Sequence, residues 1–401
     1  MNKTVFVTGV GIISGLGYGR CVTMKALREH RSAIGKIRYL STSHDLPVSE
    51  VPYSNEEMMD MLEIRHDTIM TRTALIGKLA LKEAMEDALL NLSEQSAIFI
   101  SGTTVGGMDK TELFYRDYFN SDNHKEYIKT HDCGVCSEMI AGHYKGFEMM
   151  TTLSAACSSA ANAIQIGMEL IQSGRYDIAV VGGSECISKY HLNGFNSLMI
   201  LDKEQCRPFD STRAGINLGE GAGYLVIESE ESVTRRGIKP LCILSSCANR
   251  CDAFHQTASS PNGDGAYLAM TDALREAGLE PKDIDYVNAH GTGTQGNDLS
   301  EGNALMRVFG DNMPYIASLK SYIGHTTSAV GGVEGVISVL SLLENYMPIS
   351  LNFRNKIREH SFEPLSQEII PQRLEHIMSN SFGFGGNDTV CIFSKIKENK
   401  I

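Results

Sequence analysis

The sequence predicts an α/β protein made of two similar halves. Segments typical of strands and of helices alternate along all 401 residues, and this alternation is typical of α/β folds. A second series of strands and helices begins near Pro240, with similar numbers of each. The charged, polar segment 230–239 separates the two series. We therefore expect one half at residues 1–238 and the other at residues 239–401.

Periodicity supports the elements of the first half. Apolar residues recur at helical spacing along residues 72–90, which predicts an amphipathic helix there. Residues 158–172 are rich in alanine and apolar on all sides, so we expect a buried helix. The remaining elements expected in this half are a helix at 20–33 and strands at 4–9, 97–100, 177–181 and 223–228.

The second half continues the alternation to the end of the chain. Short apolar runs rich in β-branched residues predict its strands, and longer runs at helical spacing predict its helices. The strands are expected at 241–246, 284–288, 315–317, 377–380 and 389–393, and the helices at 266–277, 298–309 and 330–343.

Composition narrows the classes of function. Hydrophobic residues make up 42% of the chain, which is enough for a large core. No apolar run reaches the ~18 residues of a membrane-spanning helix. The net charge of −12 argues against nucleic-acid binding, because neutralising phosphates needs clustered Lys and Arg. The N-terminus leads into a strand-like pattern without a signal peptide, so we expect a cytoplasmic protein with no membrane partner.

The ten cysteines predict neither a disulfide framework nor a metal site. In a long cytoplasmic chain we expect mostly buried thiols, with one catalytic candidate. The CxxC motif of Cys133 and Cys136 has His131 and His143 nearby, but the spacing fits no zinc signature. We therefore expect these residues to serve packing and no metal to be bound.

A glycine-rich segment at residues 9–15 resembles a dinucleotide-binding loop, but Ser14 stands where the third glycine is required. No acidic residue follows at the expected distance, and the sequence has no Walker A motif. We expect this segment to form a tight turn from a strand to a helix.

Cys157 is the first residue with catalytic potential. It lies among small residues at the start of the predicted helix 158–172. The helix macrodipole and the unpaired amides of a helix N-terminus favour the nucleophilic thiolate. Considered alone, a buried cysteine at such a position more often has a structural role.

Two histidines follow predicted strands in the second half. His290 stands at a strand end, and His325 comes five residues after Lys320, with Glu334 on the next helix. A glycine-rich segment at 380–387 lies close to the end of the chain. Each feature alone is more often structural, but α/β folds assemble active sites at strand ends.

Together and in this order, these segments resemble the β-ketoacyl-acyl-carrier-protein synthases, the elongating condensing enzymes of the thiolase superfamily. The resemblance covers nearly the whole chain and includes residues 9–15, 141–143, 181–185, 207–210 and 218–223. It implies a thiolase-like five-layered α/β/α/β/α sandwich of two pseudo-repeated halves. It also implies a homodimer, with residues 133–140 at the interface, and no cofactor, because decarboxylation drives the condensation.

The resemblance further implies a ping-pong mechanism. Cys157 takes an acyl group from an acyl carrier protein, and a malonyl-loaded acyl carrier protein binds next. His290 and His325 stabilise the enolate that forms as carbon dioxide leaves. The backbone amides of Cys157 and Phe384 form the oxyanion hole.

The family pattern gives roles to four further side chains. Lys320 resembles the active-site lysine that sets the electrostatics of the histidine region, and Glu334 resembles the acid that holds it. Phe384 resembles a gate that swings when an acyl chain enters, because its glycine neighbours lack a Cβ. Phe382 is expected to assist decarboxylation.

Positions that line the acyl pocket and receive the carrier protein are also implied. Val105 and Met108 fall where the family lines its acyl pocket, so we expect them to influence chain length. Arg65, Arg72 and Arg207 are candidates for the basic patch that docks an acidic carrier protein. Solvated surface charge is the alternative interpretation of these arginines.

Some positions match the family pattern although we expect no catalytic role for them, and other positions depart from the family pattern. Asp298 and Glu301 match, and we expect them to form structural salt bridges or caps. Residues 155–156 are Ala-Ala where a threonine often precedes the alanine, and residues 387–388 are Asn-Asp where Thr-Asn is common. Residues 153–164, together with residues 252–260, also resemble synthases of polyene and resorcinol-type pathways, so the pathway stays open.

Three other classes compete with this interpretation. A degradative thiolase needs a second catalytic cysteine in the closing segment, where this chain has Phe384. An initiating synthase uses an asparagine where this chain has His325. A non-catalytic partner subunit of a ketosynthase heterodimer lacks the nucleophile, whereas Cys157 is present; a heterodimeric arrangement stays open.

Overall fold

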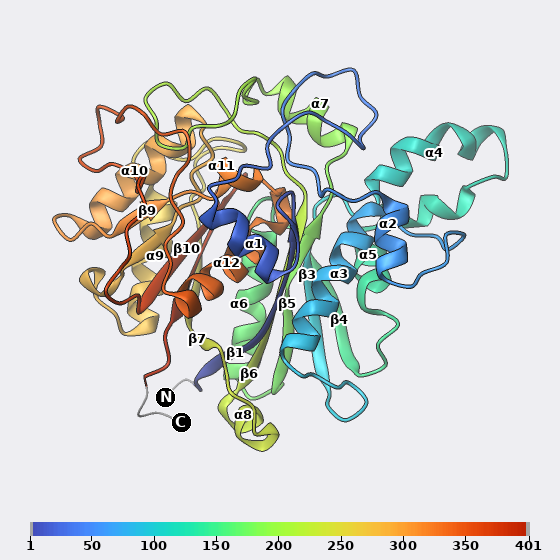
Figure 1. The fold of residues 1–401 in the computed structure, drawn as a ribbon, viewed down its shortest axis with the longest axis horizontal. Helices are drawn as coiled ribbons and strands as arrows, with labels where there is room; N and C mark the ends of the chain where they lie inside the picture. Colours follow the sequence, from blue (N-terminus) through green and yellow to red (C-terminus); the bar gives the residue numbers. More distant parts are fainter. Residues whose placement is uncertain (1–2, 398–401) are drawn as a thin grey trace.

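The computed structural model describes residues 3–397, and its two halves arrange their strands in the same way (Figure 1). The strands of the first half are β1 (Val5–Ser14), β2 (Gly17–Tyr18), β3 (Ala97–Gly102), β4 (Phe147–Leu153), β5 (Ile178–Glu185) and β6 (Gly221–Ser229). Those of the second half are β7 (Cys242–Cys251), β8 (Tyr286–Asn288), β9 (Tyr315–Ala317), β10 (His376–Gly383) and β11 (Asn387–Ser394).

Within these residues the strands join in the order β4-β3-β5-β6-β1-β7-β11-β10-β8-β9, and β2 pairs with β1. In each half, three neighbouring strands run parallel and two further pairings are antiparallel. Read from each outer edge, β4-β3-β5-β6-β1 has the same succession as β9-β8-β10-β11-β7. This agreement is the signature of a duplicated fold, although the boundary at residues 238 and 239 stays a prediction.

The α-helices are α1 (Arg20–Arg28), α2 (Asn55–Met61), α3 (Arg72–Asp87), α4 (Met108–Asn120), α5 (Cys133–Ala141), α6 (Ser159–Gln172), α7 (Lys189–Ser197), α8 (Glu230–Arg236), α9 (Asp264–Ala277), α10 (Gln295–Phe309), α11 (Lys320–Ile323) and α12 (Val330–Glu344). Short 3-10 helices are η1 (Lys125–His131), η2 (Pro281–Asp283) and η3 (Thr327–Ala329). Several of these, among them α2, α4, α5 and α7, were not expected from the sequence.

The helices complete five layers. Helices α6 and α12 pack against each other between the two halves of the sheet. Helices α3 and α5 cover the outer face of the first half, and α9 with α10 covers that of the second. The predicted α/β/α/β/α sandwich is therefore confirmed, and the alanine-rich helix lies in the middle layer as expected.

The glycines of segment 9–15 do not form the expected turn from a strand to a helix. Strand β1 continues through Gly9 and Gly11 to Ser14, and the turn that follows at Gly15 leads to the short strand β2. A Cβ at Gly9 or Gly11 would collide with the backbone of α3 at Ala84 or Ala80. These glycines therefore let α3 lie directly on β1, and the prediction of a tight turn at this point is wrong.

One helical stretch, Thr327–Glu344, is long and apolar enough to cross a membrane by length and composition alone. It comprises η3 and α12, and 89% of it is buried inside the protein. Its apolar character is explained by its place in the middle layer, between the two halves of the sheet.

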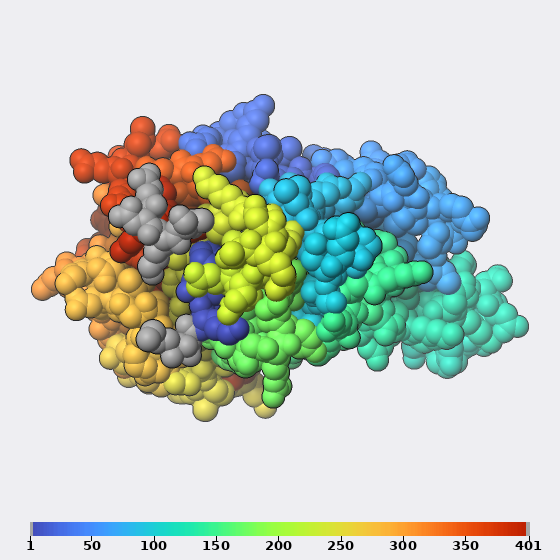
Figure 2. All heavy atoms as spheres, turned by 90° about the horizontal axis from the view of Figure 1, so that it is seen from below, coloured from blue at the N-terminus to red at the C-terminus, as the bar shows by residue number. Residues whose placement is uncertain are grey.

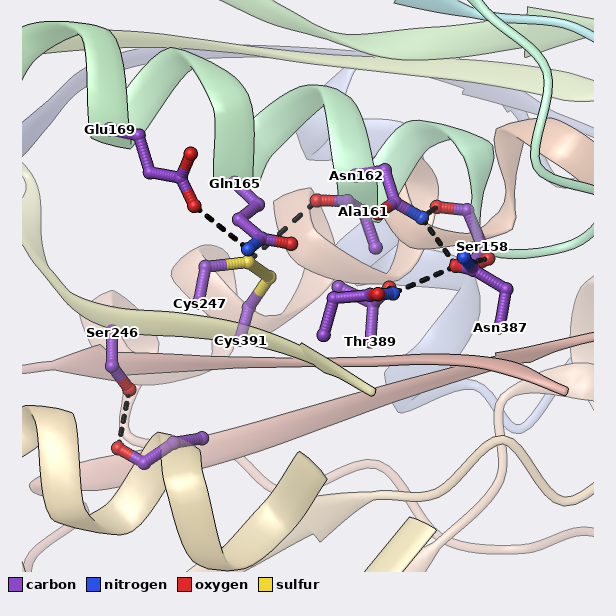
Figure 3. Close-up of a disulfide and its surroundings, with 12 residues drawn as sticks. Ser158, Ala161, Asn162, Gln165, Glu169, Ser246, Cys247, Asn387, Thr389 and Cys391 are labelled. Atoms are coloured by element: carbon purple, nitrogen blue, oxygen red, sulfur yellow. Dashed lines mark hydrogen bonds between the residues drawn. A yellow bond between two sulfur atoms is a disulfide. The ribbon is translucent and has the colours of Figure 1, made fainter. Parts of the chain in front are cut away.

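Cys247 and Cys391 face each other on the neighbouring strands β7 and β11 and form a disulfide (Figure 3). The expectation of mostly buried free thiols does not hold for this pair. The other eight cysteines are free, and Cys136, Cys157, Cys186, Cys206 and Cys242 among them are buried.

Candidate active site

Four segments bring their functional residues to one cavity. Cys157 precedes α6, His290 follows β8, His325 follows α11, and Phe382 and Phe384 lie at the end of β10 and just beyond it. All five line a cavity of about 530 Å³. The structure thus assembles the residues that the sequence predicted as nucleophile, histidine pair and gate.

A tight turn presents the nucleophile candidate. Ala156 has a φ of 49°, a left-handed conformation that is uncommon for a residue with a Cβ. Cys157 follows it directly and is 6% exposed. Its Sγ lies 3.0 Å from Nε2 of His325, which is hydrogen-bond distance for a sulfur. The strained turn therefore aims the thiol at an imidazole.

Burial changes the protonation expected for this thiol. It raises the pKa of Cys157 to about 11, although the nearby Lys320 and the backbone amides of Phe384 and Cys157 lower it. The amides at the helix N-terminus favour the thiolate, as expected, but desolvation is the larger effect in the resting site. The thiol keeps its proton and can donate it to His325.

Both histidines are neutral. Burial and the charge of Lys320 hold the pKa of His290 and of His325 well below the ordinary value of 6.5. Their ring centroids are 5.3 Å apart and the planes are nearly perpendicular, at 84°. Each neutral ring carries one N–H, so the pair can donate hydrogen bonds to an oxygen in the cavity without carrying a net charge.

Lys320 and Glu334 form an ion pair in the protein interior. Nζ of Lys320 donates to Oε1 of Glu334 across 2.9 Å, and neither side chain is exposed. The pair does not line the cavity. It acts on the site through charge, because the Lys320 ammonium lowers the pKa of Cys157 and of both histidines.

Two buried carboxylates hold the loop after β8. Glu301 accepts hydrogen bonds from the backbone N–H groups of His290 and Gly291, at 2.8 and 2.7 Å. Asp298 accepts from the backbone of Phe209 at 2.7 Å and of Gly293 at 3.1 Å. Burial raises the pKa of Glu301 to about 7. These contacts agree with the structural reading of both acids.

The two phenylalanines of the closing segment meet different partners. The ring of Phe382 lies 5.8 Å from that of His290. The ring of Phe384 stacks on Phe195, with centroids 5.8 Å apart and planes at 21°. Gly385 follows Phe384 with a φ of 83°. Sequence reasoning missed Phe195, because nothing in α7 signals a contact with a segment nearly 200 residues away.

The cavity has further lining residues that were not singled out. Thr292 and Thr294 belong to the segment that follows His290, and their hydroxyl oxygens lie 2.8 Å apart. Their place directly after a histidine at a strand end was a usable signal. Other lining residues are Leu198, Met199, Ile200, Thr257, Ala258, Ser259, Gln295, Gly296 and Asn297.

Val105 and Met108 lie outside this lining. Val105 is 6% exposed, and Met108 begins α4. Neither is among the residues that surround the cavity at Cys157. Their predicted role in chain length stays a prediction.

The three arginines predicted to dock a carrier protein differ in exposure. Arg65 is exposed and pairs with Asp67 across 3.1 Å. Only 15% of the Arg207 side chain is exposed, and this side chain pairs with Asp202 and Glu204. Both positions stay predictions.

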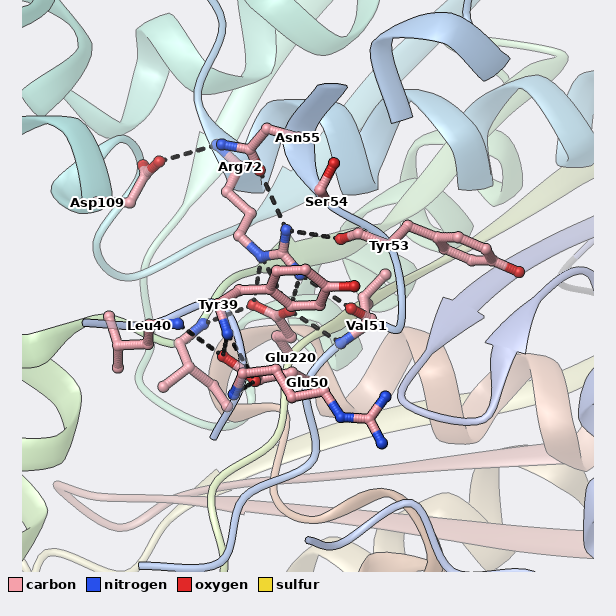
Figure 4. Close-up of polar contacts among 12 residues, drawn as sticks. Tyr39, Leu40, Glu50, Val51, Tyr53, Ser54, Asn55, Arg72, Asp109 and Glu220 are labelled. Carbon is pink, nitrogen blue, oxygen red and sulfur yellow. Dashed lines mark hydrogen bonds and ion pairs between the residues drawn. The ribbon is translucent and has the colours of Figure 1, made fainter. Parts of the chain in front are cut away.

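Arg72 is the arginine whose placement does not suit docking (Figure 4). It is 7% exposed, and its Nε donates to both carboxylate oxygens of Glu220, at 2.9 and 3.0 Å. The rest of its guanidinium donates to the carbonyls of Val51 and Tyr53 and to Asn55. Because every donor is used inside the protein, we withdraw Arg72 from the docking patch.

Among the described residues, no group of three or more His, Cys, Asp or Glu side chains is placed to hold a metal ion. Cys133 and Cys136 lie in α5, where Cys136 is buried and Cys133 is half-buried.

The chain belongs to the β-ketoacyl synthase family. Residues 2–232 match the model of the β-ketoacyl synthase N-terminal domain, and residues 241–354 match that of the C-terminal domain. The family activity is a β-ketoacyl synthase condensation, which is an acyl transfer. The assembled cysteine and histidine pair agree with this class.

Known proteins similar to the chain include a nodulation protein, a 3-oxoacyl-[acyl-carrier-protein] synthase and a ketosynthase/chain length factor. Nodulation protein E of Rhizobium meliloti (strain 1021) is 32% identical, covering 99% of this chain and 100% of that protein. 3-oxoacyl-[acyl-carrier-protein] synthase 2 of Staphylococcus aureus (strain COL) is 31% identical, covering 99% of each. The solved structure of the ishigamide ketosynthase/chain length factor has a TM-score of 0.91 at 29% identity, covering 99% of this chain and 100% of that one.

Proposed function

We propose that the protein is an elongating synthase that condenses an acyl group held on Cys157 with malonyl-acyl carrier protein, giving 3-oxoacyl-acyl carrier protein in fatty acid elongation. The observation that carries this proposal is the 3.0 Å contact between Sγ of Cys157 and Nε2 of His325, inside a cavity that His290 also lines. The name of the Staphylococcus aureus relative supports the choice of acyl carrier protein as the carrier.

The first half-reaction transfers the acyl group. Because the Cys157 thiol is protonated, His325 takes its proton as the sulfur attacks the carbonyl of the acyl carrier thioester. The backbone amides of Cys157 and Phe384 stabilise the oxyanion of the tetrahedral intermediate. The carrier's thiol then leaves with the proton, and the acyl group remains as a thioester on Cys157.

The second half-reaction joins the two units. A malonyl carrier protein places its thioester oxygen against the N–H of His290 and against Nε2 of His325. Once Cys157 is acylated it has no proton to donate to this Nε2, so His325 can adopt the tautomer with Nε2–H and donate to the oxygen. These donors stabilise the enolate formed as carbon dioxide leaves, and neutral imidazoles do so without an added ion. The enolate carbon attacks the acyl group, the bond between that group and Cys157 breaks, and the released thiolate takes up a proton from water to restore the resting thiol. Decarboxylation drives the reaction, so no cofactor is proposed.

Variants of the two histidines separate these steps. His290→Ala should lower carbon dioxide release from malonyl-acyl carrier protein by about 100-fold or more, as loss of one oxyanion donor does. The same variant should acylate Cys157 at a rate close to wild type, because His325, and not His290, is the histidine whose ring nitrogen contacts the sulfur. His325→Ala should impair both steps. Unchanged decarboxylation in both variants would show that another group stabilises the enolate.

A second candidate pathway is a polyene or resorcinol-type polyketide pathway. The structural similarity to the ishigamide ketosynthase/chain length factor favours it, together with the resemblance at residues 153–164 and 252–260. A panel of saturated and polyenoyl acyl carrier proteins distinguishes the candidates through the ratio of kcat/KM values. Preference for saturated donors supports fatty acid elongation, and preference for polyenoyl donors supports the alternative.

We propose a homodimer in the cytoplasm as the working form, with a ketosynthase heterodimer as the alternative. Strand β4 lies at an edge of the sheet and leaves one side unpaired. Helix α4 and η1 project beside it (Figures 1 and 2), and α4 exposes the aromatic rings of Tyr115, Tyr118 and Phe119. An exposed apolar surface of this kind is typical of an interaction site. Light scattering of the purified chain distinguishes a dimer from a monomer that needs a different partner.

Two remaining assignments have direct tests. If Val105 and Met108 limit the acyl chain, Val105→Phe shortens the product profile, and an unchanged profile removes both residues from the pocket.

If Arg207 docks the carrier, Arg207→Glu raises the KM for acyl carrier protein without a matching fall in kcat. Arg65→Glu makes the parallel test for the exposed arginine.

A further inference from the structure

Asn387 makes a set of contacts that none of the catalytic, pocket or docking roles proposed above involves. It begins β11, three residues after Phe384, where the family commonly has a threonine. Its Oδ1 lies within hydrogen-bond distance of three donors, Oγ of Ser158 at 2.6 Å and Nδ2 of both Asn162 and Asn249 at 2.8 Å. The single Ser158 hydroxyl proton is shared with the Ala155 carbonyl, which is 2.8 Å from the same Oγ. Figure 3 shows Ser158 and Asn162 converging on Asn387.

Two of these donors belong to the start of the nucleophile's helix. Ser158 follows Cys157 directly and is the N-terminal cap residue of α6. Asn162 uses its second amide hydrogen on the Ser158 carbonyl, at 3.0 Å. On the other side, Asn387 is separated from Phe384 by two glycines; Phe384 lines the same cavity as Cys157, and its backbone amide lowers the pKa of the Cys157 thiol. Asn387 therefore links the two segments whose amides flank that sulfur.

The third donor anchors this link to the sheet. Nδ2 of Asn249, on β7, also donates to Oγ1 of Thr389, two residues further along β11. Gly385 and Gly386 have no side chains, so backbone contacts hold them: the Gly385 N–H donates to the Gln256 carbonyl at 2.8 Å, and the Gly386 carbonyl accepts from the Asp252 N–H at 2.7 Å. Asn387 supplies the side-chain contact that joins the β11 end of this stretch to the start of α6.

We propose that Asn387 is a positioning residue that holds the amide of Phe384 against the Cys157 sulfur for acyl transfer. The proposal rests on the proposed role of Cys157 as nucleophile. An asparagine oxygen reaches one bond further than a threonine hydroxyl and has no proton of its own, so it can accept from all three donors at once. A displacement of about 1 Å at a reacting group costs about 100-fold in rate.

The test compares two reactions of the same sulfur. Acylation by an acyl carrier protein needs the oxyanion hole, whereas alkylation by iodoacetamide does not. In Asn387→Leu, which keeps the shape and removes the acceptor, acylation should fall by about 100-fold while alkylation stays within about 3-fold of wild type. Asn387→Asp keeps an acceptor oxygen and should recover most of the acylation rate.

The control removes a similar asparagine outside the cavity. Asn345 accepts from the Leu374 amide at 2.9 Å and donates to the Pro371 carbonyl at 2.8 Å. Asn345→Ala should lower the melting temperature and leave acylation unchanged. If Asn387→Leu does not fold, Asn387→Thr, which has the residue common in the family, replaces it and should acylate more slowly than wild type.

Each outcome decides the proposal. Acylation by the Asn387 variants within about 3-fold of wild type overturns it, and so does an equal fall in acylation and alkylation, which indicates general loss of structure. Absence of any acyl adduct on the wild-type enzyme removes the proposed nucleophile as well. An adduct that forms at the same rate with and without the Asn387 acceptor refutes the positioning role alone.

Discussion

Removing one charge from the buried ion pair of Lys320 and Glu334 tests how much this pair contributes to the stability of the folded protein. Nζ of Lys320 and Oε1 of Glu334 are 2.9 Å apart with no exposed surface. At an effective dielectric constant of about 20, their attraction is about 6 kcal/mol, part of which offsets the cost of taking both charges out of water. Glu334→Gln leaves the ammonium buried without a counter-charge. We expect the free energy of unfolding to fall by about 3–5 kcal/mol.

Urea denaturation followed by circular dichroism measures this change at pH 7. The matched control is the double variant Lys320→Met/Glu334→Leu, which removes both charges and fills the same space. It should be within about 1 kcal/mol of wild type in stability, because replacing both partners of a buried pair by apolar groups is often neutral. A loss below about 1 kcal/mol in Glu334→Gln, or a double variant as unstable as the single one, would refute the reasoning.

Two further predictions concern proton binding. Burial beside Asp252 and Glu301 raises the pKa of Asp388 from 3.8 to about 8. The folded protein therefore keeps a proton on Asp388 that the unfolded chain releases above about pH 4. The free energy of unfolding consequently falls as the pH rises from 4 toward 8. Asp388→Asn removes this loss and should raise the free energy of unfolding by up to about 4 kcal/mol at pH 7. The gain in melting temperature over wild type should grow between pH 5 and pH 8. An Asp388→Asn variant with no gain at pH 8 would contradict this prediction. Because the pKa of Cys157 is about 11, its alkylation by iodoacetamide should still accelerate above pH 9. Lys320→Met should move this profile of alkylation rate against pH to higher pH, because the ammonium that lowers the pKa is removed. A plateau of the wild-type rate near pH 8 would show that Cys157 is a thiolate at rest.

The sequence predicted the parts of the fold and site that depend on local pattern. The buried helix after Cys157 and the histidines after β8 and α11 lie where periodicity and strand ends placed them. The same strand succession in both halves agrees with the duplication inferred from the alternation of elements. Local hydrophobic patterning determines these features, so the residues themselves carry the signal.

What the sequence did not predict depends on partners that are distant in the chain. Arg72 looked like a surface charge, and its burial follows from Glu220, 148 residues later. The glycines of β1 signalled a turn, and their role is to admit α3. The thiolate expected of Cys157 depends on solvent exposure, which the fold removes. No local pattern encodes these tertiary contacts.

The central claim is that Cys157 is the sulfur that carries the acyl group. Intact-protein mass spectrometry after incubation with saturated and polyenoyl acyl carrier proteins tests it directly. The account predicts an acyl adduct on the wild-type enzyme that maps to Cys157 and is absent from Cys157→Ala. No adduct with any donor, or an adduct that persists in Cys157→Ala, would contradict it.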